Sequence, residues 1–129
     1  MLIDPLADAM SNLKNQENAG NLNCAIRPAS KIIASVLKIF KERGYIGDFE
    51  FIQDGKGGKF NVKLSGKLND CGAIKPRHAV KSLNFDKYEK RYLPATGFGL
   101  LVLSTSQGIM SHEDAKKSGL GGRLLCYVY

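Results

Sequence analysis

Cysteine is scarce in this chain of 129 residues, and its copies do not pair. Cys24, Cys71 and Cys126 are odd in number and widely spaced. A disulfide framework or a zinc site needs paired cysteines at characteristic intervals, so this pattern favours neither. We therefore expect three reduced thiols that act as small apolar residues in a cytoplasmic protein.

Long apolar runs are also missing. The longest lies around residues 98–103, whereas a transmembrane helix needs about 20 apolar residues. No signal peptide, repeat, heptad pattern or low-complexity segment is visible either. The sequence therefore predicts no membrane partner.

The common catalytic motifs are absent too. There is no G-x-S-x-G, no phosphate loop ending in Gly-Lys-Ser/Thr, no H-E-x-x-H and no complete G-x-G-x-x-G. His112 precedes two acidic residues, but acids are expected in the first turn of a helix because of its dipole. We expect no enzyme, no metal and no cofactor. A small hydrolase that uses His112 and the hydroxyls of residues 104–106 is the alternative, because catalytic groups can converge from distant positions.

Positive charge is what the chain has in excess. Its 19 Lys and Arg against 12 Asp and Glu give a net charge of +7. Residues 27–45 hold five basic and one acidic residue, hence +4, and residues 46–95 hold ten and six, again +4. Clustered cations release counterions from phosphates, so this charge favours a polyanionic partner such as a nucleic acid. Apolar residues, at 43%, are sufficient for a folded core.

The hydrophobic pattern predicts an α/β (α+β) fold of two small lobes. We expect an N-terminal helix-strand-helix-hairpin lobe over residues 1–70 and a C-terminal, mostly β lobe with one short helix over 71–129. The elements expected in chain order are a helix over 5–15, a strand over 22–27, a helix over 29–43, a hairpin turning at 54–58, one or two short strands within 66–95, a strand over 98–105, a loop over 106–110, a short helix from Ser111 to Gly119 and a strand over 123–129. The apolar stripe expected on the second helix comprises Ile32, Ile33, Val36, Leu37 and Phe40, and Gly44 suits its C-terminal cap.

A hydroxyl-rich segment ends the strand expected over 98–105. Ser104, Thr105 and Ser106 are followed by Gly108 and by the start of a helix. Hydroxyls donate and accept hydrogen bonds, so they can contact phosphates, ribose 2′-hydroxyls and base edges. A helix start adds backbone N–H donors. The segment is thus a candidate RNA-binding loop, and the alternative is that these are ordinary turn residues.

Two further segments are rich in basic residues. Lys31 lies on the polar face of the second expected helix, where it either follows a phosphate backbone beside Arg27 or simply faces solvent. The segment 75–92 mixes basic and aromatic residues, among them Arg77, Tyr88 and Arg91. Because arginine and tyrosine stack on exposed bases, RNA binding is one interpretation of this segment. The other is a polar linker with tyrosines partly in the core.

Several blocks of the sequence together resemble a known family. The run 104–111, the glycine-rich block 119–122 and the ending 125–129 are similar to those of small-subunit ribosomal protein number eight. So are the opening 4–8 and the blocks 28–31 and 42–46. The resemblance covers essentially the whole chain in order.

The resemblance implies a two-lobed α/β protein that binds directly to the central domain of small-subunit ribosomal RNA. It implies a structural component that supports subunit assembly beside neighbouring small-subunit ribosomal proteins. It also implies a cytoplasmic protein on the ribosome, which is a monomer when free. The family's RNA-binding residues correspond here to Ser104, Thr105, Ser106 and Gly108, and to Ser30 and Lys31 at the second helix.

One position departs from the bacterial pattern of that family. Arg123 stands where bacterial members usually carry Glu, and the segments 75–77 and 91–95 look like the archaeal or eukaryotic branch. Arg123 is therefore an additional candidate for a phosphate contact. An RNA-binding translational repressor that acts outside the ribosome is the alternative function.

Overall fold

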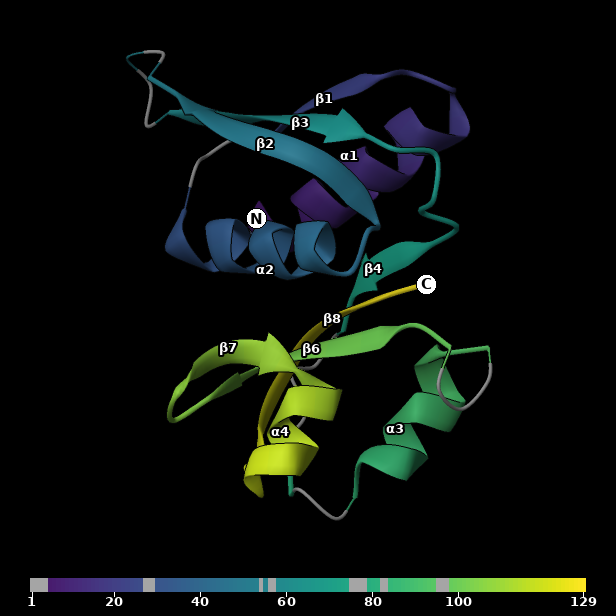
Figure 1. Ribbon diagram of the computed structural model, residues 1–129, viewed down its shortest axis with the longest axis vertical. Coiled ribbons are helices and arrows are strands. Elements are labelled where there is room, and N and C mark those ends of the chain that lie inside the picture. The colour runs from purple at the N-terminus through teal and green to yellow at the C-terminus, as the bar shows by residue number, and fades with distance from the viewer. Residues whose placement is uncertain are drawn as a thin grey trace, which may run out of the picture. The chain divides into compact units, whose positions relative to one another are not determined.

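The computed structural model describes residues 5–26, 30–53, 55, 58–74, 79–81, 84–94 and 98–129. The chain divides into two compact units, Met1–Cys71 and Gly72–Tyr129, and it contains two antiparallel sheets whose strands are labelled in Figure 1. The α+β fold of two lobes expected from the sequence is confirmed. A domain boundary at residue 70 stays a prediction.

The first unit is a three-stranded sheet with two helices. Its strands lie in the order β1-β3-β2, and Figure 1 shows both helices on the same side of the sheet. The expected hairpin is confirmed, with Phe51 opposite Phe60 in an antiparallel pair. The elements in chain order are α1 (Pro5–Asn18), β1 (Asn23–Ile26), α2 (Lys31–Glu42), β2 (Ile46–Ile52) and β3 (Lys59–Leu64).

The core of the first unit follows the helical period with one exception. Ile33, Val36, Leu37 and Phe40 of α2 are buried as expected, but Ile32 is 40% exposed. The four buried residues recur at spacings of three and four, whereas Ile32 lies roughly a quarter turn away from the middle of their stripe. Including Ile32 in the stripe was therefore wrong.

Glycine ends α2 in the way its sequence suggests. Gly44 has a φ of 80°, a left-handed conformation that glycine adopts without a steric penalty. The N–H of Gly44 donates to the carbonyl of Lys41, and the N–H of Tyr45 donates to that of Phe40. These two bonds satisfy carbonyls at the helix end that would otherwise lack partners.

The second sheet has the strand order β4-β8-β6-β7, with β5 paired to β8. Two helices pack against the face that carries Leu101, Leu103 and Leu124, contributing Phe85 and Ala115 to one buried cluster. The elements in chain order are β4 (Cys71–Ala73), β5 (Ala79–Val80), α3 (Phe85–Tyr92), β6 (Leu100–Thr105), β7 (Gly108–Ser111), α4 (His112–Ser118) and β8 (Gly122–Val128).

Two expectations for this part of the chain need correction. The segment 66–95 contains the two short strands expected there, but it also contains the helix α3, which was not predicted. Residues 106–110 are not a loop, because Gly108–Ser111 form β7 and pair with β6 as a hairpin. Only Ser106 and Gln107 form its turn. The short helix with Ser111 as its N-cap and Gly119 as its C-cap is confirmed.

The three cysteines are buried thiols, as the sequence analysis expected. Burial raises the pKa of Cys24 to about 11 and that of Cys71 to about 12. Both thiols therefore stay protonated at neutral pH, and their burial makes them poor nucleophiles.

Candidate RNA-binding surface

Thr105 builds the turn between β6 and β7. Its hydroxyl donates to the carbonyl of Gly108 over 2.8 Å and accepts the N–H of Gln107 over 3.1 Å. Gly108 has a φ of 115°, which a residue with a side chain adopts only at a cost. For Thr105 and Gly108 the structure thus supports the interpretation as turn residues.

The two neighbouring serines are placed differently. Ser104 and Ser106 are exposed, and their hydroxyls make no hydrogen bond within the part of the chain that the structure describes. A hydroxyl that is not used inside the protein keeps one donor and two acceptor positions for a ligand. The serines are therefore the residues of this turn that are available for binding.

Arg123 lies directly beside Ser104. The two residues face each other in the antiparallel pair of β6 and β8, and both are exposed. Directly opposed residues project to the same face of a sheet, and the adjacent pair of Leu103 and Leu124 is buried. We call Ser104, Ser106 and Arg123 the serine–arginine surface. Sequence analysis selected all three residues, but it did not show that Ser104 and Arg123 face each other.

Two glycines allow the strands of this surface to approach each other closely. A Cβ atom on Gly122 would come within 2.1 Å of the carbonyl oxygen of Ser104, and one on Gly121 within 2.4 Å of that of Val80. Any side chain at either position would therefore push β8 away from β6 or from β5. The sequence analysis noted this glycine pair only for its resemblance, and its positioning role depends on pairing between distant segments.

The start of α4 is less suited to binding a phosphate than the sequence suggested. The hydroxyl of Ser111 accepts the N–H of Asp114 over 3.3 Å, so the cap already uses one of the helix-end donors. Glu113 and Asp114 lie in the first turn, where their charges repel a phosphate. The expectation that this helix end supplies donors to RNA is not supported.

His112 belongs to a buried polar network between α3, α4 and β6. Its Nδ1 accepts the N–H of Leu101 over 3.0 Å, and its Nε2 lies 3.2 Å from Oε1 of Glu89. The Nζ of Lys116 lies 2.5 Å from the same oxygen. Burial lowers the pKa of His112 below its usual value, against the opposing effect of Glu89. Both ring nitrogens are thus occupied inside the unit, and neither can activate a serine as the hydrolase alternative requires.

The candidate residues of the first unit lie at the start of α2. Ser30 is the N-cap of this helix, and its hydroxyl accepts the N–H of Ile33 over 3.2 Å. Lys31 and Lys38 are exposed, whereas Lys41 forms a 2.9 Å ion pair with Asp48. Ser30 therefore has a structural role, while Lys31 has the exposure that a phosphate contact needs.

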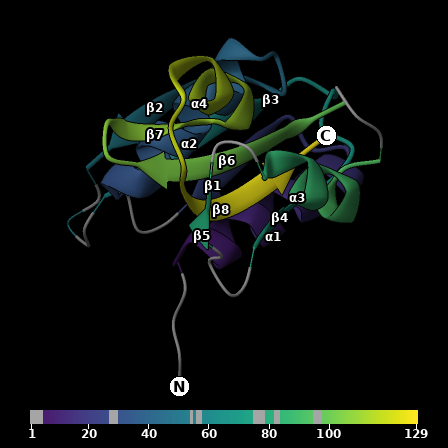
Figure 2. The ribbon, with the colours of Figure 1, turned by 90° about the horizontal axis from the view of Figure 1, so that it is seen from below.

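The remaining candidates lie on α3 or outside the described residues. Tyr88 is half-buried and Arg91 is exposed, with its guanidinium carbon 5.4 Å from the ring centre of Tyr92. Figures 1 and 2 both place α3 away from the β6–β7 turn, near the other end of β6. Tyr88 instead lines a pocket with Ala79, which pairs with Arg123 across β5 and β8, so it lies toward Arg123 and not toward the turn. Arg77 and Arg27 lie outside the residues that the structure describes.

Comparison with known families matches nearly the whole chain. A family model described as Ribosomal protein S8 matches residues 4–129, which is nearly the whole chain. In the described residues, no helix has the length and apolar character needed to cross a membrane. The same residues contain no group of three His, Cys, Asp or Glu that could hold a metal ion.

Proposed function

The chain belongs to the ribosomal protein S8 family, and we propose that it binds directly to the central domain of small-subunit ribosomal RNA through its serine–arginine surface. Proteins of this family are structural ribosomal proteins and not enzymes. They bind ribosomal RNA and neighbouring ribosomal proteins in the small subunit. What is proposed here is the target within that RNA and the residues that contact it.

The observation that carries this proposal is the register of β6 and β8. It places the exposed Ser104 opposite the exposed Arg123. An RNA helix displays 2′-hydroxyls and base edges in a wide, shallow minor groove, with phosphates along its rim. Serine hydroxyls suit the groove, since they both donate and accept, and an arginine suits a phosphate because of its charge and its fork of donors. Ser106, two residues further along the chain in the turn, adds a second exposed hydroxyl.

Exposed lysines of the first unit support the same proposal, because they provide positive charge for RNA phosphates. Lys31 and Lys38 are exposed on α2, in the segment 27–45 that has five basic residues and one acidic residue. Such lysines bind phosphates without reading sequence, so they increase affinity and leave selection of the site to the serines. Ser30, Arg77, Tyr88 and Arg91 remain predicted contacts.

The proposal extends to the role of the complex. A protein that binds an RNA stem with two separate units fixes the local shape of the RNA, which favours later binding of neighbouring proteins. We therefore expect the chain to support assembly of the small subunit, to act in the cytoplasm on ribosomes and to be a monomer before it binds RNA.

Equilibrium binding to a fragment of the central domain tests the proposal. Ser104→Ala and Arg123→Gln should each weaken binding about 5- to 150-fold, since about 1–3 kcal/mol is lost when an interface group is left without its partner. Ser118→Ala is the matched control, because Ser118 is exposed at the end of α4. If Ser104→Ala and Arg123→Gln bound the fragment as tightly as the wild type and Ser118→Ala do, the serine–arginine surface would be excluded as the binding site. Wild-type protein that prefers messenger RNA to this fragment would favour the repressor alternative.

A further inference from the structure

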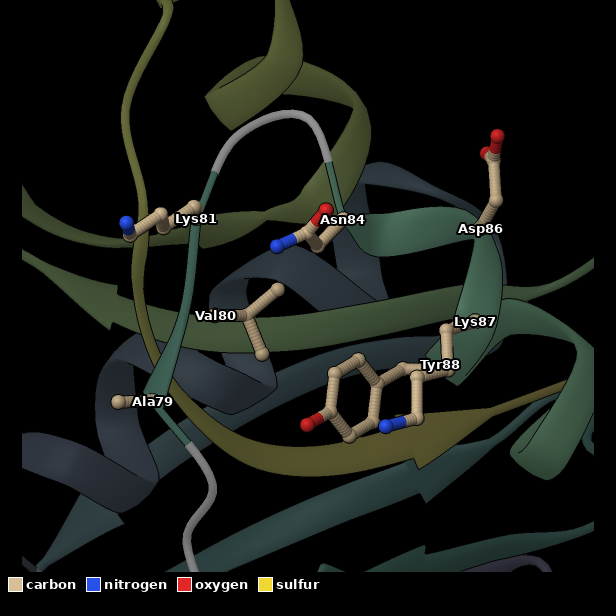
Figure 3. A pocket seen from close by; sticks show the side chains of 7 residues that line it. All are labelled: Ala79, Val80, Lys81, Asn84, Asp86, Lys87 and Tyr88. Carbon is tan, nitrogen blue, oxygen red and sulfur yellow. The ribbon is translucent and has the colours of Figure 1, made fainter.

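A pocket lies between β5 and the start of α3, and it borders the serine–arginine surface where Ala79 of its lining pairs with Arg123. Its volume is about 420 Å³, which is within the usual range for sites that hold a small ligand. Figure 3 shows Val80 and Tyr88 at its apolar side and Lys81 and Asn84 above them. Asp86 and Lys87 also line the pocket.

The apolar side of the pocket is suited to binding a flat group. Val80 is only 5% exposed and belongs to the core cluster, so it forms a fixed floor. Tyr88 is half-buried and packs against the same cluster, which holds its ring in place. A fixed aromatic ring beside an apolar floor is the arrangement on which nucleic-acid bases stack.

The polar rim complements the other parts of a nucleotide. Lys81 and Lys87 are exposed, and the Nζ of Lys87 lies 5.7 Å from the ring centre of Tyr88, so it can reach a phosphate attached to a nucleoside on that ring. Asn84 is the N-cap of α3, but its side chain makes no capping bond. Its amide therefore has a donor and an acceptor for the edge of a base.

The one acidic residue of the rim does not oppose this binding. Asp86 lies 3.4 Å from the Nζ of Lys116, a cation that it shares with Glu89, and Figure 3 shows its carboxylate directed away from Val80 and Tyr88. Lys87 occupies one side of the Tyr88 ring, but an exposed cation–π contact is weaker than stacking of a base on an aromatic ring. An arriving base can therefore displace the ammonium group toward its own phosphate.

We propose that this pocket binds one unpaired nucleotide of an RNA, with its base on Tyr88 and its phosphate at Lys81 and Lys87. The proposal rests on the proposed function only for the identity of the RNA. The pocket is too small for a base-paired stem, so its ligand is a nucleotide that has left the stack. The serine–arginine surface and the pocket would then read a stem and an unpaired nucleotide of the same RNA.

The absence of tryptophan from the chain provides a direct test. Tyr88→Trp introduces a single tryptophan whose fluorescence a stacked base quenches. We expect quenching when this protein is titrated with the central-domain fragment and with single-stranded oligoadenylate. Tyr92→Trp is the matched control, since Tyr92 is on the same helix but stacks on Tyr127 and does not line the pocket. Its fluorescence should change little with oligoadenylate.

Charge variants complete the test. Lys81→Ala with Lys87→Ala should reduce the salt slope of oligoadenylate binding by about 0.7, because the two lysines share one phosphate and each neutralised phosphate on a single strand contributes about 0.7. Asp86→Asn should leave that slope unchanged. Tight binding of the central-domain fragment without quenching of the tryptophan would overturn the pocket proposal and leave the proposed function intact. Quenching by oligoadenylate without binding of the fragment would support the pocket and overturn the proposed function.

Discussion

Thr105→Val and Ser106→Ala each delete one hydroxyl from the same turn, and the structure predicts different consequences for them. Thr105 loses two hydrogen bonds, to Gly108 over 2.8 Å and to Gln107 over 3.1 Å. Each bond contributes about 0.5–1.5 kcal/mol. Because water partly replaces bonds at an exposed site, we expect a loss of about 1–2 kcal/mol in the free energy of unfolding. This corresponds to a decrease in Tm of roughly 4–8 °C for a chain of this size.

Ser106→Ala should have the converse effect. The hydroxyl of Ser106 makes no hydrogen bond in the described structure, so the free energy of unfolding should stay within about 0.5 kcal/mol of the wild-type value. Cognate RNA should bind about 5- to 150-fold more weakly, since an RNA group loses its partner in the interface. Affinity for an unrelated RNA stem should change little.

Thermal unfolding by circular dichroism and equilibrium RNA binding, measured on the same preparations, separate the two roles. The reasoning predicts a lower Tm for Thr105→Val and a lower cognate affinity for Ser106→Ala. It is refuted if Ser106→Ala lowers Tm and binds cognate RNA normally, because the serine would then be a turn residue like Thr105.

Three further predictions concern Gly122 in the strand pairing, the buried network around His112, and the exposed lysine Lys31 of α2. Gly122→Ala should lower both stability, by about 1–3 kcal/mol, and RNA affinity, because its Cβ would meet the carbonyl of Ser104 at 2.1 Å; unchanged unfolding in urea would contradict this. His112 has a pKa lowered by burial from its usual 6.5, so the unfolded chain binds the proton more readily and stability should fall as pH decreases below about 6.5. Urea unfolding from pH 7.5 to 5 should show less of this loss in His112→Asn, which cannot titrate; an equal loss would mean that other groups cause it. Lys31→Ala should reduce the salt slope of RNA binding by about 0.7–0.9 for cognate and unrelated RNA alike, whereas Lys41→Ala, whose lysine is paired with Asp48, should change it less.

Local signals made much of the fold predictable from the sequence. Ser111 as a cap and Gly44 and Gly119 after helices act within one turn, and the structure confirms each of them. The helix α3 was not predicted because its buried positions include Glu89, a residue type that normally faces solvent. The contacts of this carboxylate to His112 and Lys116 explain its burial, and neither lies near it in sequence.

The candidate site was predictable as a set of residues but not as a surface. Ser104 and Arg123 are far apart in the chain, and the register that joins them shifts between Val102 and Leu103. Such an irregularity moves side chains from one face to the other, so no alternation pattern reveals which residues meet. One of the two hydrogen bonds that assign Thr105 to the turn is made to the carbonyl of Gly108 in β7, where a loop was expected.

A footprint of the purified protein on full-length small-subunit ribosomal RNA tests the central claim most directly. Backbone cleavage of the RNA, with and without protein, shows which nucleotides become protected. We expect protection of a stem in the central domain, and we expect a protein with both Ser104→Ala and Arg123→Gln to lose it at the same concentration. Protection outside the central domain, or protection that survives both substitutions, would contradict the account.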